Sequence, residues 1–158
     1  MLLFKNPIPM YILEFISDSF GAKIDAFSES QHQELFAQAL LIVKENFKGC
    51  LDIIEPCNYW LSNRGIYSPE RVTDLQRKAD IADKKYQNLE DEFGDETTES
   101  TFYFRKMCAF NGLWELYGMQ TFSLRKSYDV IYDLAWSAPD IDEFSDLLEK
   151  RTLIALKY

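Results

Sequence analysis

Residues that usually carry enzyme chemistry are scarce in this sequence. It holds one histidine, three cysteines and six glycines among 158 residues, and no G-x-S-x-G elbow, Walker loop, H-E-x-x-H motif or Rossmann glycine pattern. A single imidazole also leaves no second histidine for a dyad or a multi-histidine metal site. We therefore expect the protein not to be an enzyme and to need neither a cofactor nor a metal ion.

His32, the one histidine, falls in the polar first turn of an expected helix. No serine or cysteine at a meaningful spacing accompanies it, so the sequence shows no nucleophile that it could activate. We expect an exposed helix residue rather than a general base.

The cysteines Cys50, Cys57 and Cys108 are too few, and odd in number, for the disulfide framework of a small secreted protein. This usage favours a reducing compartment, and we expect the cytoplasm. Cys50 and Cys57 lie seven residues apart with Pro56 between them, whereas a zinc site needs closer pairs and four ligands. We expect buried thiols.

Long apolar runs are also absent, since no stretch reaches the roughly 18 residues of a membrane-spanning helix. The apolar start "MLLFKNPIPMYILEFI" is interrupted by Pro7, Pro9 and Glu14, and no small-residue cleavage site follows it. It predicts a buried N-terminal segment, and we expect no membrane partner.

Basic residues are outnumbered, with 17 Lys and Arg against 26 Asp and Glu, which gives a formal net charge of −9. A field of that sign repels a phosphate backbone. Nucleic acid is therefore not an expected ligand.

Helical patterns account for most of the chain. The strongest predicts a long helix over about 69–93, with Ser68 as its N-cap, Pro69 at its first position and Gly94 as its stop. Its apolar positions repeat in steps of three and four residues, which is typical of a narrow seam that packs on one partner helix. These positions are Val72, Leu75, Ala79, Ala82, Tyr86, Leu89 and Phe93.

Similar periodicity predicts helices in the segments 28–48, 101–117, 124–136 and 141–158. The segment 50–67 contains Pro56 and predicts one short helix or two turns. No sustained alternation of apolar and polar residues supports a strand. The sequence therefore predicts an all-α fold.

One domain over residues 1–158 is the simplest organisation, because a chain of this length buries roughly 70% of its unfolded surface. The sequence holds 12 Phe, 9 Tyr and 3 Trp and shows no internal repeat. We predict a single-domain antiparallel bundle of about six helices with an aromatic-rich core.

Acidic residues gather in two zones. The first, in "QNLEDEFGDETTES" (87–100), has no basic residue and includes an expected acidic loop over about 94–100. The second covers 129–149, with no Lys or Arg before Lys150, and aromatic residues are interleaved with it at Tyr128, Tyr132, Trp136 and Phe144. From both zones we select candidate partner-binding residues: Glu90, Asp91, Glu92, Asp95, Glu96, Glu99, Asp129, Tyr132, Asp133, Trp136, Asp140, Asp142 and Glu143.

These features favour an acidic protein-binding module whose partner is a basic protein. Clustered carboxylates speed association with a cationic surface, and exposed aromatic residues supply anchors. In size and charge the chain resembles immunity proteins, which protect bacteria from their own nuclease toxins. That resemblance implies inhibition of a basic toxin by carboxylates that cover its cationic active site.

Four other interpretations remain open. In the first, both acidic zones are only solvated faces. In the second, the protein is an enzyme of unrecognised family that uses Asp129 and Asp133, which lie four residues apart on one helical face. The protein could instead be a helical adaptor that forms a homodimer through the 72–93 seam. A DNA mimic would need a regular double row of acids.

Overall fold

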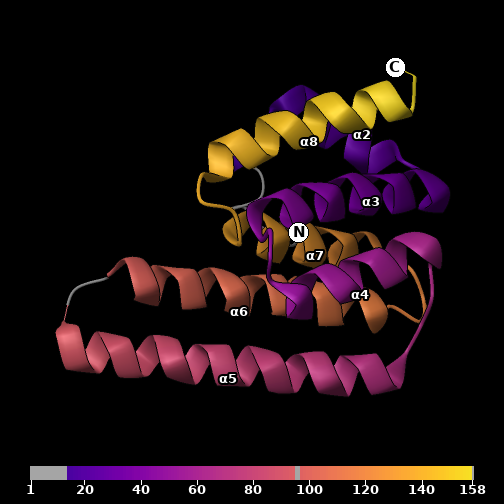
Figure 1. The fold of residues 1–158 in the computed structure, drawn as a ribbon. Helices are drawn as coiled ribbons and strands as arrows, with labels where there is room; N and C mark the ends of the chain where they lie inside the picture. The colour runs from indigo at the N-terminus through magenta and orange to yellow at the C-terminus, as the bar shows by residue number, and fades with distance from the viewer. Residues whose placement is uncertain (1–13, 95–96, 158) are drawn as a thin grey trace, which may run out of the picture.

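The computed structural model describes residues 14–94 and 97–157 (Figure 1). Within these ranges the elements are seven helices, and no strand is present: α2 (Asp18–Ala26), α3 (Glu29–Asn46), α4 (Leu51–Ser62), α5 (Pro69–Phe93), α6 (Thr98–Tyr117), α7 (Leu124–Trp136) and α8 (Ile141–Ala155). The all-α prediction is confirmed. In the same ranges, no helix has the length and apolarity that crossing a membrane requires.

The N-terminal segment predicted to be buried lies mostly at 1–13, outside the described residues. Of its remainder, Ile16 is only 4% exposed, and the Ser145 hydroxyl donates to the Phe15 carbonyl. The following helix, α2, is the element that sequence periodicity did not identify. Ser17 caps it through its side-chain oxygen and also donates to Glu149 of α8 at 2.9 Å.

Local capping residues fix most helix ends where the sequence predicts them. Ser68 accepts the Arg71 N–H at the start of α5, and Gly94 ends that helix with a φ of 83°, a conformation that glycine adopts without steric cost. The predicted acidic loop at about 94–100 is shorter than expected. Thr97 and Ser100 form a capping box, so α6 begins at Thr98 and Glu99 lies in its first turn.

Pro56 does not divide the segment 50–67. It lies inside α4, which remains one helix from Leu51 to Ser62. Contacts with α6 hold this helix: the Tyr117 hydroxyl donates to the Pro56 carbonyl at 2.6 Å, and Lys106 pairs with Asp52 at 2.9 Å. Of the two alternatives, the single short helix is correct.

The helices form an antiparallel bundle in which α6 is central to the lower half (Figure 1). Helix α5 packs on α6, and α6 also contacts α7 and α4. Helix α3 joins α7, α4 and α8 in the upper half. The seam of α5 therefore finds its partner within the chain, with Leu75, Ala79 and Ala82 at 2–4% exposure.

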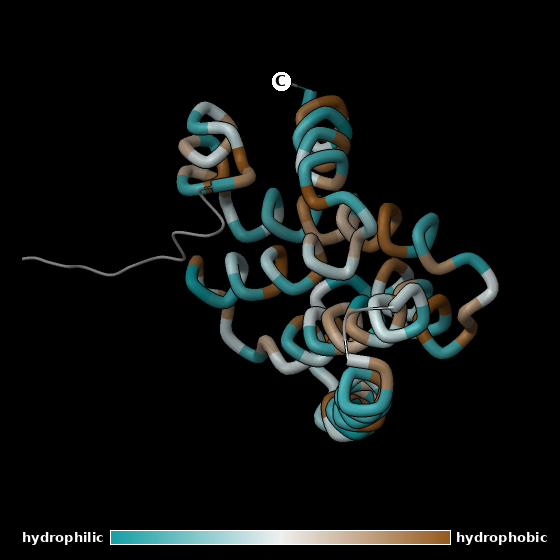
Figure 2. Tube along the Cα trace, turned by 90° about the vertical axis from the view of Figure 1, so that its left-hand side faces the viewer, coloured by the Kyte–Doolittle hydropathy of each residue, from teal (hydrophilic) through white to brown (hydrophobic). Residues whose placement is uncertain are grey.

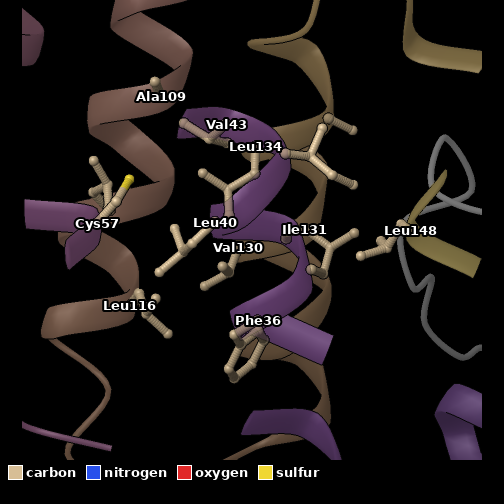
Figure 3. Packing of buried hydrophobic residues seen from close by; sticks show 14 of the residues in the cluster. Phe36, Leu40, Val43, Cys57, Ala109, Leu116, Val130, Ile131, Leu134 and Leu148 are labelled. Carbon is tan, nitrogen blue, oxygen red and sulfur yellow. The ribbon is translucent and has the colours of Figure 1, made fainter. Parts of the chain in front are cut away.

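Aromatic side chains supply much of the core. The largest fully buried side chains include Trp60, Tyr117, Tyr128, Phe20, Phe36, Phe47, Phe110 and Phe144, which confirms the aromatic-rich core. Figure 3 shows the aliphatic centre, where Leu40 and Val43 of α3 lie beside Leu134 of α7. Figure 2 shows how hydrophilic residues dominate the outer helix α5.

One close contact sets the distance between α6 and α7. A Cβ atom on Gly112 of α6 would lie 2.5 Å from Leu134 Cδ2 and 3.3 Å from the Leu134 backbone nitrogen of α7. Leu134 has no exposed surface, so it has little room to move away. Glycine is required at position 112 because any side chain would push the two helices apart.

This contact predicts that Gly112→Ala destabilises the protein by about 1–2 kcal/mol, because overpacking outweighs the gain of about 1 kcal/mol in helix propensity. Urea unfolding measures the change in the free energy of unfolding. The double variant Gly112→Ala/Leu134→Ala should lose less than the sum of the two single variants. A stabilised Gly112→Ala variant would show that the helices are not in close contact there.

Candidate functional site

The topology brings the two acidic zones to one end of the molecule. Short connections reverse the chain after α5 and again after α7, so both turns fall on the same side (Figure 1, left). We call this region the acidic end and define it by the described carboxylates of the two turns: Glu90, Asp91, Glu92, Glu99, Asp140, Asp142 and Glu143. Asp95 and Glu96, also predicted as partner-binding residues, lie outside the described residues.

The acidic residues of this end differ in their local environments. Asp140 is the N-cap of α8, where its carboxylate accepts the backbone N–H groups of Asp142 and Glu143 at 3.0 and 3.2 Å. Asp142 and Glu143 lie in the first turn of α8, where the positive end of the helix dipole stabilises a negative charge. These carboxylates contribute to local stability.

The carboxylates of α5 lack that support. Glu90, Asp91 and Glu92 lie near the C-terminal end of the helix, where the dipole disfavours negative charge, and no basic residue lies in the last turn. Asp91 and Glu92 are exposed, and Glu90 is half-buried. The stability of α5 therefore does not explain why three acidic residues occupy its C-terminal end.

Two exposed aromatic residues accompany these acids. Phe93 is 60% exposed at the end of α5, and Trp136 is 40% exposed at the end of α7. Tyr132 is half-buried and meets Trp136 edge to face, with ring centroids 6.3 Å apart. The sequence suggested Tyr128 and Phe144 as further anchors, but both are core residues at 2% and 1% exposure.

Asp129 and Asp133 do not belong to the acidic end. Both are half-buried on α7 and face α6, where Glu115 joins them. Periodicity did not single out Glu115, because its neighbours Asp129 and Asp133 come from a different helix. The three carboxyl groups form a cluster between α6 and α7.

Burial is the main cause that raises the pKa of Glu115 to about 10, followed by the charge of Asp133, a hydrogen bond between the two side chains, and the charge of Asp129. Burial and the charge of Asp129 also raise the pKa of Asp133, while its hydrogen bond with Glu115 acts in the opposite direction. Glu115 therefore keeps its proton at neutral pH and donates it to the Asp133 carboxylate.

A cavity of about 500 Å³ lies beside this cluster. Its walls come from the loop before α5, the first turns of α5, the end of α6 and the start of α7, which meet at the end of the bundle opposite the acidic end (Figure 1, right). The residues that line it are Tyr67, Pro69, Val72, Thr73, Trp114, Glu115, Gly118, Lys126 and Asp129. In residues 14–94 and 97–157, no group of three His, Cys, Asp or Glu side chains is placed to hold a metal ion.

His32 was expected to be exposed, and that prediction is wrong. It is 1% exposed, with its Nδ1 atom 2.7 Å from Oγ of Ser127, which is also 1% exposed. Phe122 covers the ring with centroids 4.8 Å apart, and burial lowers the pKa of His32. The histidine and the serine link α3 to α7 inside the core, where a substrate has no access.

All three cysteines are free thiols, and the prediction that they are buried holds for Cys57 and Cys108 but not for Cys50, which is partly exposed. Burial raises the pKa of both Cys57 and Cys108 to about 12. Neither thiol ionises appreciably near neutral pH, so neither has the reactivity of a catalytic cysteine.

No protein family, curated protein or solved structure matches the chain.

Glu115→Gln should make the protein more stable at neutral and alkaline pH. The unfolded chain releases the Glu115 proton above about pH 4.5, whereas the folded chain retains it, so this group costs more stability as pH rises toward its raised pKa. Glutamine cannot ionise, yet its amide can still donate to Asp133. The Tm difference between variant and parent should be small near pH 5 and should grow steadily toward pH 9.

The exposed Glu92 provides a matched control, because Glu92→Gln should give a Tm difference that varies little with pH. Equal Tm differences for Glu115→Gln at low and high pH would contradict the protonated state assigned to Glu115. Differential scanning calorimetry across the pH series measures both variants.

Proposed function

We propose that the protein is an acidic protein-binding module that recognises a basic protein partner through its acidic end. The observation that carries this proposal is the set Glu90, Asp91 and Glu92, which lies where the dipole of α5 disfavours negative charge. Residues that lower local stability often serve binding. Phe93 and Trp136 add exposed aromatic surface among these acids.

Several basic residues of the chain pair with acids away from the acidic end. Arg77 and Lys78 pair with Asp74 in the N-terminal half of α5, and Arg71 pairs with Glu55 near the end opposite the acidic end. Arg71 also lies over the Tyr59 ring, 3.8 Å from its centroid. These three charges are used within the bundle and do not neutralise the acidic turns. Arg105, whose Nε donates to the Ser137 carbonyl beside the α7–α8 turn, and Lys85, which lies near Glu99, are bases closer to the acidic end.

Inhibition of a basic toxin, such as a nuclease, is the most concrete form of this function. A nuclease active site is positively charged because it binds phosphates. An acidic end with aromatic anchors can cover such a site, and its charged hydrogen bonds strengthen as water is excluded. The net charge of −9 supports the same choice of partner.

Two charge-matched variants should change stability in opposite directions. Asp91→Asn/Glu92→Gln removes acids from the C-terminal end of α5 and should raise the Tm slightly. Asp142→Asn/Glu143→Gln removes acids from the first turn of α8 and should lower it. Thermal unfolding at low salt measures both, and equal shifts would mean that the α5 acids carry no local cost.

Both variants should nevertheless bind the partner more weakly. The partner is the basic protein that the parent chain retains from a native lysate at low salt and releases at high salt. Each neutralised pair should lower the association rate constant several-fold, on the order of 10-fold when combined, because exposed charges act mainly on encounter. Trp136→Ala should instead raise the dissociation rate constant.

The control is a variant with three exposed acids neutralised away from the acidic end, Glu29→Gln/Glu70→Gln/Asp80→Asn. It removes three negative charges, against two in each acidic-end variant, and should keep nearly the full association rate. If the control and the acidic-end variants lose binding equally, net charge alone attracts the partner and the acidic end is not its site. Addition of the parent chain should also suppress the toxic activity of the retained protein.

A further inference from the structure

The cavity at the opposite end has the size and lining of a small-molecule site. Its volume of about 500 Å³ falls within the roughly 300–1,000 Å³ of such pockets. Pro69 and Val72 give it an apolar wall, and Tyr67 and Trp114 give it two aromatic rings. The Trp114 indole N–H donates to Asn111 Oδ1 at 2.9 Å, which fixes the ring before any ligand arrives.

Carboxyl groups converge on one side of this cavity. Glu115 and Asp129 line it directly, and Asp133 lies behind Glu115. The Oε1 atom of Glu115 is buried and has no hydrogen-bond partner among the described residues. A buried acceptor without a donor is costly, so a rotation of the Glu115 side chain toward a donor in the cavity would remove that cost.

We propose that this cavity binds a small organic cation, an amine or guanidine carried on an aromatic or aliphatic body. The cationic group donates to Glu115 and Asp129, and the body lies against Tyr67, Trp114 and Val72. Aromatic faces attract a positive charge, and carboxylates hold it by charge-assisted hydrogen bonds. The site is separate from the acidic end, so it does not depend on the function proposed there.

When the cation binds, its positive charge replaces that of the proton on Glu115. Glu115 holds a proton that it shares with Asp133, and the bound ammonium takes the place of that proton, which leaves to solvent. Affinity should therefore rise between about pH 6 and pH 8, a range in which an alkylammonium keeps its own proton. The other ionisable side chains that line the cavity around Glu115 are Asp129, Lys126 and Tyr67. Thr73 of α5 also lines it, and the buried thiol of Cys108 lies near Asp133.

Calorimetric titration tests the proposal with tryptamine, phenethylamine and agmatine as probes. Tryptophol is the uncharged counterpart of tryptamine, and 2-phenylethanol is that of phenethylamine. At least one amine should bind, and its alcohol counterpart should bind about tenfold more weakly or not at all. The indole N–H signal of Trp114 should shift in the NMR spectrum, whereas that of Trp136 at the acidic end should not.

The affinities of three variants test the site, and two of them report the sign of the ligand's charge. Asp129→Asn should weaken amine binding about tenfold, and Lys126→Gln should strengthen it, because the two side chains carry opposite charges beside the same cavity. Tyr67→Ala removes a 44% exposed ring and should weaken binding without unfolding the protein. Asp91→Asn at the acidic end is the matched control and should have no effect.

Three results would overturn the proposal: no amine binds at millimolar concentration, the alcohols bind as tightly as the amines, or Asp129→Asn leaves the affinity unchanged while Lys126→Gln lowers it. The last pattern would indicate an anionic ligand. Circular dichroism of each variant checks that the fold is retained. The test does not depend on Asp129 alone, because Tyr67→Ala and Lys126→Gln alter side chains that are half-exposed or exposed.

Discussion

The close approach of α6 and α7 at Gly112 determines much of what this protein can do. Gly112 lies against Leu134, and the next turn of α6 carries Glu115 while the residue before Leu134 is Asp133. Helices held this tightly bring the two carboxyl groups together and bury them. One proton is then shared between them, because two neighbouring charges in a poorly solvated place are unfavourable. The apolar contact between Gly112 and Leu134 thus determines the protonation of the Glu115–Asp133 pair.

The acidic residues of the chain occupy two different environments, solvent-exposed and buried, which composition does not distinguish. At the acidic end, Asp91 and Glu92 face water, so their electrostatic effect reaches outward and weakens with salt. Between α6 and α7, Glu115 is buried and neutral, so its effect is short-ranged and depends on hydrogen bonding. Alternating helix directions separate the two environments, since the α5–α6 and α7–α8 turns fall at one end and the cavity at the other.

The sequence predicted what depends on neighbours in the chain. Ser68, Pro69 and Gly94 fixed the ends of α5, because caps act within one turn, and the seam of α5 identified the face that packs. The Thr97–Ser100 capping box also acts locally, but the acidic residues around it favour a loop, so the sequence predicted a longer loop than the structure has. Spacing alone could not reveal His32 with Ser127, which lie 95 positions apart, or Glu115 with Asp133. Tyr128 and Phe144 had the composition of binding anchors, but the tertiary packing of α3, α7 and α8 placed them in the core.

Helix α5 is held mainly by one neighbour, α6, while α6 itself contacts three helices. Backbone amides in such an outer helix exchange with solvent through partial opening that leaves the remaining bundle intact. α5 also supplies Pro69, Val72 and Thr73 to the cavity and Asp91 and Glu92 to the acidic end. Partial opening of α5 therefore removes residues from both ends of the molecule at once, although the two sites share no residue.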